Sequence, residues 1–220
     1  SKLFQRMGRI QEQMLMNREG AAEAYRRALE LDATAIVAIE SLKSMASENE
    51  DWGSYIRYLK MEIDVTDDEE DRFELHVEAA DYYDRVEEDD LKALEQLELA
   101  IDIEPADVEC TSKLAEYHFR NENYEDAGQY YRRLLNLTDG ASTPAELCHR
   151  KYRLGYTYER LEDLDNALRS YQEAVQADPT YLAAQEALAQ MLLSSEQYEL
   201  ARDAFQRIIE EHREELTASE

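Results

Sequence analysis

The residues of this chain best suited to nucleophilic or metal chemistry are two cysteines and four histidines. The adjacent pair Cys148-His149 has the composition of a thiol–imidazole dyad, but neighbouring residues of a helix point about 100° apart and do not face each other. A metal site would need distant segments to converge, and its ligands would be Cys110, His118, Cys148 and His149. We therefore predict no catalytic and no metal-binding residue.

Other catalytic signatures are missing from the sequence. It contains no phosphate-binding glycine loop, no H-E-x-x-H and no G-x-S-x-G. The acidic segment TDDEED, residues 66–71, lacks the glycine and the alternating ligands of an EF-hand calcium loop. Carboxylates are so abundant that a close pair of them carries no information about acid–base catalysis. We expect a protein that is not an enzyme and that uses no cofactor.

The chain is strongly acidic, with 51 acidic against 24 basic residues and a formal net charge of −27 at pH 7. Such a surface repels the phosphates of nucleic acids and of anionic lipids, so we expect no nucleic-acid partner. No apolar run approaches the roughly 18 residues of a membrane span, so we expect no membrane insertion. A basic protein or peptide stays open as a partner. The alternative is that the acidic residues only keep the surface solvated.

Composition favours an all-helical fold in a reducing compartment. The chain has only 6 Gly and 3 Pro, and the good helix formers Ala, Leu, Glu, Gln and Arg recur throughout. Its two cysteines, Cys110 and Cys148, lack C-x-x-C spacing, which is typical of reduced thiols. No signal-peptide pattern opens the sequence. Together these features indicate a cytoplasmic protein.

An internal repeat decides how these residues are positioned. Ala167 is followed by Tyr171 and then by Ala174, and a pattern of Ala, then an aromatic residue or Leu, then a small or apolar residue returns along the chain at steps of 34 residues or 34 plus a short insertion. A second pattern, Leu154-Gly155 with Tyr158 three residues later, precedes it, and the first and third units carry one extra residue between the two patterns. The other copies of the first pattern begin at Ala21, Tyr55, Ala93, Ala127 and Ala201. Two linked patterns repeated in this way indicate a repeat protein.

Each repeat unit reads as a helical hairpin. Apolar residues recur at spacings of three and four, which places them on one face of a helix in each half of the unit. Gly155 and Ala167 are small where the two helices must approach closely, and Tyr171 fills the space beside them. Pro105 and Pro179 stand just past second helices, which they cannot continue. Because one hairpin cannot bury its own apolar face, neighbouring hairpins must stack.

The pattern L-G-x-x-Y…A-x-x-x-Y/F…P at this period resembles the tetratricopeptide repeat. The resemblance implies an all-α, right-handed superhelix of about six hairpins. The units are residues 2–35, 36–69, 73–107, 108–141, 148–181 and 182–215, with insertions at 66–71 and 139–147. The first two units are divergent: in the second, Lys43 stands in the glycine place and Tyr55 in the alanine place. We expect residues 1–220 to be one array and part of a longer one.

The family resemblance implies a concave groove, lined by the first helix of each hairpin, that holds a peptide. Helical phase turns Tyr152, Tyr156 and Phe119 toward this groove, where the hairpin core does not need them. Exposed aromatics beside arginines are typical of binding hot spots, although these rings could instead pack between helices. The predicted groove residues are Arg85, Glu116, Phe119, Arg120, His149, Tyr152, Tyr156 and Arg160.

One function of the family is disfavoured. Members that hold the acidic C-termini of heat-shock chaperones use Lys, Arg and Asn on this face as a carboxylate clamp. The matching places of this chain hold Ser44, Asp81, Glu116, Tyr156 and Gln190. Because Asp81 and Glu116 would repel a terminal carboxylate, we expect no such clamp.

The hypothesis is therefore a non-enzymatic scaffold that binds a protein or peptide segment in its groove. Three alternatives remain open. The array could self-assemble through its repeat ends, since Phe205, Ile208 and Ile209 precede a polar tail rather than a capping helix. It could be an acidic chaperone or adaptor for a basic client protein, or a regulatory array attached to an enzyme outside this segment.

Overall fold

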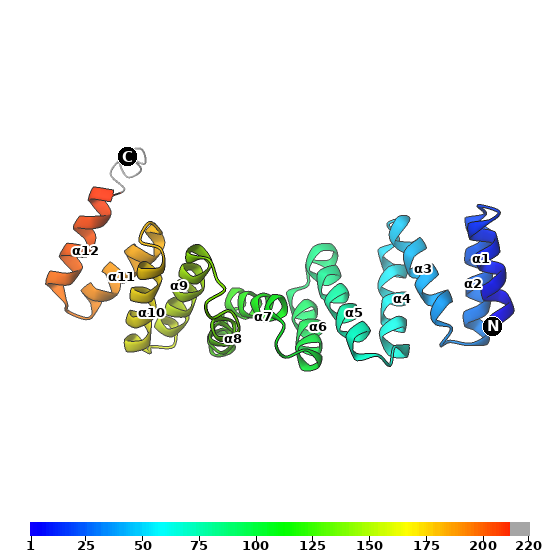
Figure 1. Cartoon of the computed structure of the whole chain (residues 1–220), viewed down its shortest axis with the longest axis horizontal. Helices are drawn as coiled ribbons and strands as arrows, with labels where there is room; N and C mark the ends of the chain where they lie inside the picture. The colour runs from blue at the N-terminus through cyan, green and yellow to red at the C-terminus, as the bar shows by residue number, and fades with distance from the viewer. Residues whose placement is uncertain (212–220) are drawn as a thin grey trace. The chain divides into compact units, whose positions relative to one another are not determined.

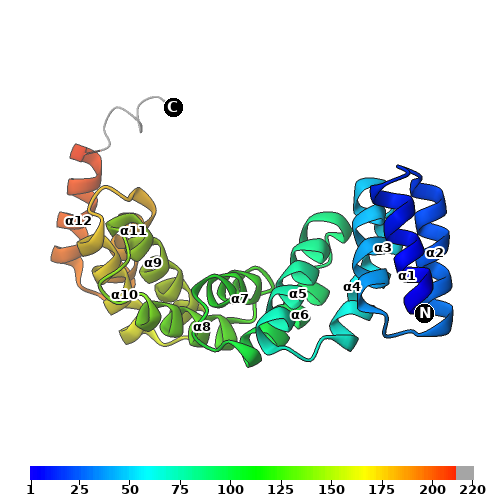
Figure 2. The same cartoon turned by 45° about the vertical axis from the view of Figure 1, so that its right-hand side comes forward.

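The computed structural model describes residues 1–211, and these form twelve α-helices and one short π-helical segment, with no strand. Consecutive helices pair into six antiparallel hairpins. Figures 1 and 2 show the two helices of a hairpin side by side, as in α1 with α2 and α9 with α10. The prediction of an all-α fold of about six helical hairpins is confirmed.

The hairpins fall into two compact units, Ser1–Pro105 and Ala106–Glu220. Within each unit, the second helix of one hairpin packs against the first helix of the next. Unit 1 consists of α1 (Lys2–Gln13), α2 (Arg18–Leu31), α3 (Ile36–Glu48), α4 (Trp52–Val65), α5 (Glu69–Tyr82), the π-helical segment η1 (Tyr83–Glu87) and α6 (Asp90–Ile103). Unit 2 consists of α7 (Val108–Arg120), α8 (Tyr124–Leu137), α9 (Pro144–Arg160), α10 (Leu164–Ala177), α11 (Leu182–Ser194) and α12 (Tyr198–Glu211).

Small residues and tyrosines lock the two helices of a hairpin together. A Cβ atom at Gly155 would lie 2.7 Å from Cδ1 of Tyr171, and one at Gly8 would lie 2.5 Å from Cε1 of Tyr25. Both tyrosines are fully buried, as is Ala167. A side chain at either glycine would clash with the tyrosine ring. Because that ring is fully buried, it has no free space into which it could move.

Each hairpin turn is closed by a non-glycine residue in the left-handed region, with φ between 50° and 61°. These residues are Met16, Glu50, Glu88, Glu122, Glu162 and Glu196. The second helix then starts at a capping residue; Asn17, Asp51, Asp89 and Asp163 each accept a hydrogen bond from a backbone N–H of the first turn. Local capping, rather than glycine, thus defines where the second helices begin.

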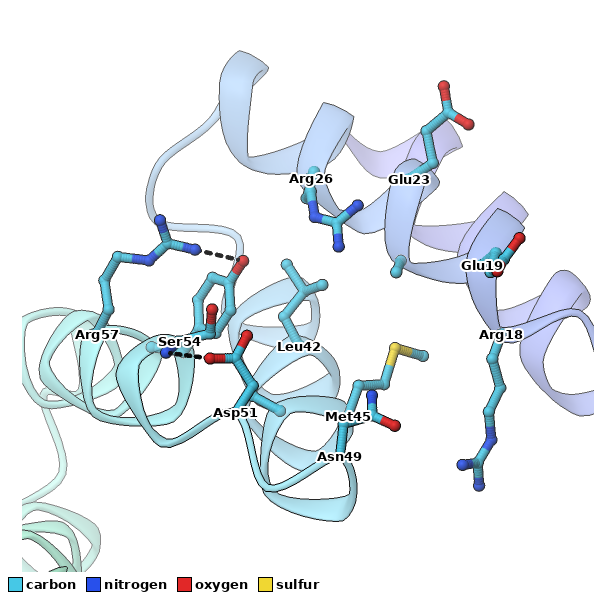
Figure 3. A pocket seen from close by; sticks show the side chains of 13 residues that line it. Arg18, Glu19, Glu23, Arg26, Leu42, Met45, Asn49, Asp51, Ser54 and Arg57 are labelled. Atoms are coloured by element: carbon cyan, nitrogen blue, oxygen red, sulfur yellow. Dashed lines mark hydrogen bonds between the residues drawn. The ribbon is translucent and has the colours of Figure 1, made fainter.

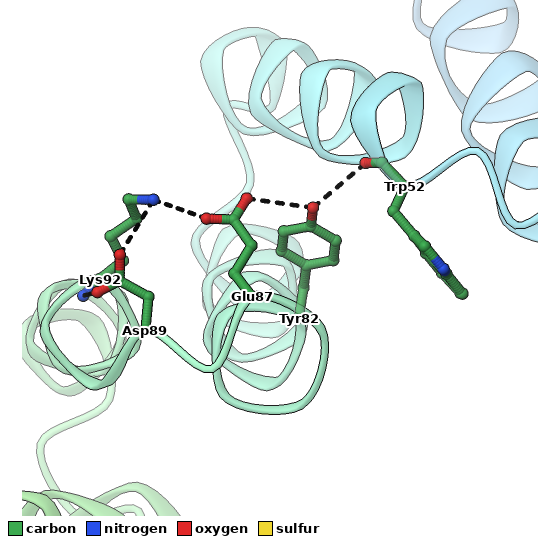
Figure 4. Close-up of polar contacts among 5 residues, drawn as sticks. All are labelled: Trp52, Tyr82, Glu87, Asp89 and Lys92. Atoms are coloured by element: carbon green, nitrogen blue, oxygen red, sulfur yellow. Dashed lines mark hydrogen bonds and ion pairs between the residues drawn. The ribbon is translucent and has the colours of Figure 1, made fainter.

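The third hairpin departs from the others at its turn. Here the first helix ends in the π-helical segment η1. The Asp89 N–H donates to the Tyr83 carbonyl, six residues back, and a bond of the same span joins Asn17 to Gln11 in the first hairpin. A chain of polar contacts holds the segment (Figure 4). Lys92 Nζ lies 2.6 Å from Glu87 Oε2 and 3.1 Å from Asp89 Oδ2. The Tyr82 hydroxyl lies within hydrogen-bond distance of Glu87 and of the Trp52 carbonyl.

The second hairpin carries an ion pair where the others are apolar. Lys43 stands in the place of Gly155, and Glu62 in the place of Ala174. Lys43 Nζ lies 2.8 Å from Glu62 Oε2 and 2.9 Å from Glu78 Oε2, and both Lys43 and Glu62 side chains are largely buried. Burial raises the pKa of the Glu62 carboxyl above its ordinary value, although Lys43 acts in the opposite direction. The second unit therefore differs from the others in having charged core residues at these positions, while its two helices still form a hairpin.

Candidate protein-binding groove

In unit 2, α7 and α9 bring most of the predicted groove residues together. Phe119 and Tyr156 are in contact, with ring centroids 5.3 Å apart. Tyr124, at the start of α8, completes a cluster; its centroid lies 6.0 Å from that of Phe119 and 6.2 Å from that of Tyr156. All three side chains are half-buried. This aromatic cluster joins the first helices of the two hairpins and still reaches solvent.

Tyr152 lies one turn earlier on α9. Its ring centroid is 6.0 Å from that of Tyr171 and 5.7 Å from that of Tyr181, and it packs against two groups of buried core residues. Phe119 and Tyr156 likewise pack against core residues. The expectation that the core does not need these three rings is therefore wrong. Each of the three rings is half-buried: one part packs against the core and the rest is open to solvent.

The arginines of the groove stack on these rings. The Arg160 guanidinium lies 5.4 Å from the centroid of Tyr124. Arg153, which the helical phase did not single out, lies 4.3 Å from the centroid of Phe119, and its Nη2 is 3.8 Å from Glu116 Oε2. Its spacing of three from Tyr156 and four from His149 was the signal available for placing it on this face. Arg120, by contrast, stacks 4.4 Å from the ring of Tyr117 on its own helix.

Glu116 accepts a hydrogen bond from the hairpin core, since Phe119 stands where other hairpins carry a glutamate. In the first and fifth hairpins the core tyrosine donates to a glutamate at one helical place: Tyr25 to Glu12 at 2.9 Å, and Tyr171 to Glu159 at 2.7 Å. Phe119 stands at that place in the fourth hairpin, and the Tyr131 hydroxyl donates to Glu116 instead, at 2.7 Å. Burial and this carboxylate raise the pKa of the Tyr131 hydroxyl well above its ordinary value. The exchange puts an aromatic ring into the groove and ties Glu116 to the core.

The remaining predicted residues lie in different settings. His149 is half-buried on α9 near Glu116 and Arg153, and burial lowers its pKa below the ordinary value of 6.5. It is therefore neutral at neutral pH and can both donate and accept a hydrogen bond. Arg85 lies in unit 1, on η1, and lines a different hollow there.

The two cysteines are buried and free. Burial raises the pKa of the Cys110 thiol to about 12 and that of the Cys148 thiol to about 11, so neither is a thiolate at neutral pH. Over residues 1–211, no three His, Cys, Asp or Glu side chains are arranged to hold a metal ion. In the same range, no helix has the length and apolar character needed to cross a membrane.

Unit 1 has several hollows of its own. One of them lies between α2, α3 and α4, and Leu42 and Met45 are in its lining (Figure 3). Its rim carries three arginines and three carboxylates: Arg18, Arg26, Arg57, Glu19, Glu23 and Asp51. Arg57 donates a hydrogen bond to the hydroxyl of Tyr58 at 2.8 Å. The balanced charges of this rim favour no particular kind of ligand. Two further hollows lie along α5.

The fold and the groove define a class: a stack of helical hairpins whose first helices present half-buried aromatic and charged side chains. Residues 152–215 match the tetratricopeptide repeat family. This segment belongs to that family, which confirms the resemblance predicted from the sequence.

Solved structures share the fold over most of the chain. The crystal structure of MamA protein is 15% identical, with a TM-score of 0.62, over 83% of this chain and 94% of that one. MamA from Desulfovibrio magneticus RS-1 is 18% identical, with a TM-score of 0.56, over 88% and 96%. YrrB, described as a tetratricopeptide repeat protein with an unusual peptide-binding site, is 17% identical, with a TM-score of 0.52, over 84% and 89%. No curated protein matches the chain.

Proposed function

We propose that the chain is a non-enzymatic scaffold that holds a protein or peptide segment in the unit 2 groove, between α7 and α9. Tetratricopeptide repeats are protein-interaction modules, which supports the general role. The observation that carries the site is the aromatic cluster of Phe119, Tyr124 and Tyr156, half-exposed and flanked by Arg153 and Arg160. Aromatic and arginine side chains in such settings contribute most of the binding energy at protein interfaces.

The groove would recognise its ligand through mixed contacts. The ring faces offer apolar area at little cost in side-chain entropy, since a tyrosine has only two rotatable side-chain bonds. The arginines are already stacked on the rings, so that their orientation is largely set before a ligand arrives. Glu116 and neutral His149 supply hydrogen-bonding groups between the rings. An extended segment with apolar and polar residues in alternation fits this arrangement.

The double variant Tyr152→Ala/Tyr156→Ala should weaken partner binding by at least about tenfold, because truncating hot-spot aromatics removes most of the apolar contact. A photo-crosslinking amino acid at position 156 would capture the partner, and titration of the purified partner against wild type and variant gives the ratio. Tyr198→Ala is the matched control, since Tyr198 is exposed on α12 outside the groove. Unchanged affinity of a folded double variant would refute the proposal; circular dichroism establishes that it is folded.

A second candidate function, self-association, is supported by one apolar stripe. Leu3, Met7 and Ile10 of α1 and its C-cap residue Met14 are all substantially exposed and recur at spacings of three and four. Met7 and Ile10 correspond by repeat position to Leu154 and Thr157 of α9, which are buried. Sedimentation velocity over a wide range of concentration should show dimers or larger species that the variant Met7→Lys/Ile10→Lys lacks. A wild-type monomer at every concentration would exclude self-association.

A further inference from the structure

Unit 1 contains an aromatic groove along α5, and Arg85, the one predicted groove residue of this unit, lies in its lining. It is lined by Trp52 and Tyr55 of α4, by Val77 and Tyr82 of α5, and by Val86 of η1. The side chains of Trp52 and Val86 are 37% and 40% exposed. The Tyr55 ring lies between the other two aromatics, with its centroid 5.8 Å from that of Trp52 and 5.5 Å from that of Tyr82. Large apolar side chains are thus held open to solvent on one face.

The polar contacts around η1 hold this groove in shape. The Tyr82 hydroxyl lies 3.4 Å from the Trp52 carbonyl oxygen and 3.2 Å from Glu87 Oε1, and Glu87 in turn binds Lys92. Figure 4 shows the Trp52 indole extending away from this chain of contacts rather than into it. Tyr55 is fixed from the other side, since its hydroxyl donates to Glu78 Oε1 at 2.6 Å. The exposed indole therefore belongs to a pre-formed surface.

The groove continues along α5 into a strongly acidic hollow. The two share Glu74 and Glu78 in their linings. Together they are lined by eight acidic and two basic side chains, a formal charge of −6. Lys43, one of the two basic groups, is already bound by Glu62 and Glu78. Glu40 and Glu74 form no ion pair with any residue of the described range. The half-buried floor of this hollow includes Ile36 and Val65.

We propose that this surface of unit 1 binds a cationic protein segment, rich in Lys or Arg, that carries one large apolar side chain. The apolar side chain would cover Trp52 and Val86, and the basic residues would lie along Glu74 and Glu40. Carboxylates gathered in a groove focus their field there and attract a positively charged chain. Nucleic acids and acidic peptides carry the wrong charge for it. The site is separate from the unit 2 groove and does not depend on the function proposed for that groove.

The probe is a synthetic twelve-residue peptide of Lys, Arg and Ser with one central Phe, carrying a fluorescent label. Trp52 is the only tryptophan of the chain, so its emission should shift to shorter wavelength as the peptide covers it. Fluorescence anisotropy with the full chain gives the dissociation constant. Binding should weaken steeply as salt rises from about 0.05 to 0.5 M, over which range charge attraction is progressively screened.

Variants separate the apolar anchor from the charge. Trp52→Ala and Val86→Ser should each raise the dissociation constant, the first by about tenfold or more, and Val86→Ser keeps the tryptophan signal and removes only surface contact. Glu40→Gln/Glu74→Gln should weaken binding several-fold. The charge-matched control Glu95→Gln/Asp102→Asn changes exposed carboxylates of α6 that line neither hollow and should bind like wild type.

Four results would overturn the proposal. The first is no binding at low salt. The second is that wild-type protein binds a peptide with Ser in place of Phe as tightly as the original peptide, or that the folded variants Trp52→Ala and Val86→Ser bind the original peptide as tightly as wild type does. In either case the attraction would be only electrostatic. The third is equal binding of a peptide with Glu in place of Lys and Arg. The fourth is loss of binding in Tyr152→Ala/Tyr156→Ala, which would place the peptide in unit 2.

Discussion

Replacing Lys43 by alanine should lower the free energy of unfolding by about 3 kcal/mol, the usual cost of breaking a buried ion pair from one side. The ammonium group contacts Glu62 and Glu78 at 2.8 and 2.9 Å. Without it the Glu62 carboxylate, which is largely buried between α3 and α4, has no opposite charge in contact. Burial already raises the pKa of Glu62, which indicates how little solvent reaches it. Urea unfolding followed by circular dichroism measures the loss.

The double variant Lys43→Ala/Glu62→Ala provides the decisive comparison. Both positions then carry the residue found at the same repeat places elsewhere, such as Ala115 and Ala100, which are fully buried. We expect the double variant to recover most of the lost stability, because an apolar pair needs no compensating charge. If instead the double variant is as unstable as Lys43→Ala, the penalty comes from lost packing rather than from an uncompensated carboxylate. The coupling energy of the mutant cycle distinguishes the two.

Replacing Tyr171 by alanine should cost about 4 kcal/mol, as for other fully buried aromatic residues. Its ring is 1% exposed, faces Gly155 across the hairpin and packs against Met191 of the next one. The variant therefore loses contacts both within a hairpin and between hairpins. Thermal and urea unfolding of the full chain give the value.

Two matched variants show where that energy arises. Tyr171→Phe keeps the ring and removes only the hydrogen bond to Glu159, so it should cost about 1 kcal/mol. Tyr198→Ala removes a tyrosine that is 61% exposed and should change stability by less than about 0.5 kcal/mol. Equal costs for Tyr171→Phe and Tyr171→Ala would mean that the hydroxyl, not the ring, holds the hairpin.

The sequence alone determined the helices, their pairing into hairpins and the residues that pack between the two helices of a hairpin. These features follow from local rules: spacings of three and four place Tyr171 and Ala174 on one face, and close helix approach demands a residue as small as Gly155. The outward phase of Tyr152, Tyr156 and Arg160 could be predicted in the same way. All of these are properties of one helix or of one hairpin, and a repeat displays them several times.

Only the tertiary structure decided which side chains are in contact across hairpins, because the helical phase of a residue does not specify its partners. It stacked Arg153 on Phe119, buried one side of each groove tyrosine, and moved the partner of Tyr131 to Glu116 because Phe119 occupies the usual carboxylate place. It also paired Lys43 with Glu62 and formed η1 at the third turn, where Val86 lines the groove beside Trp52. The physical reason is that the partner of a side chain depends on residues from another helix, whereas its helical phase depends only on its own.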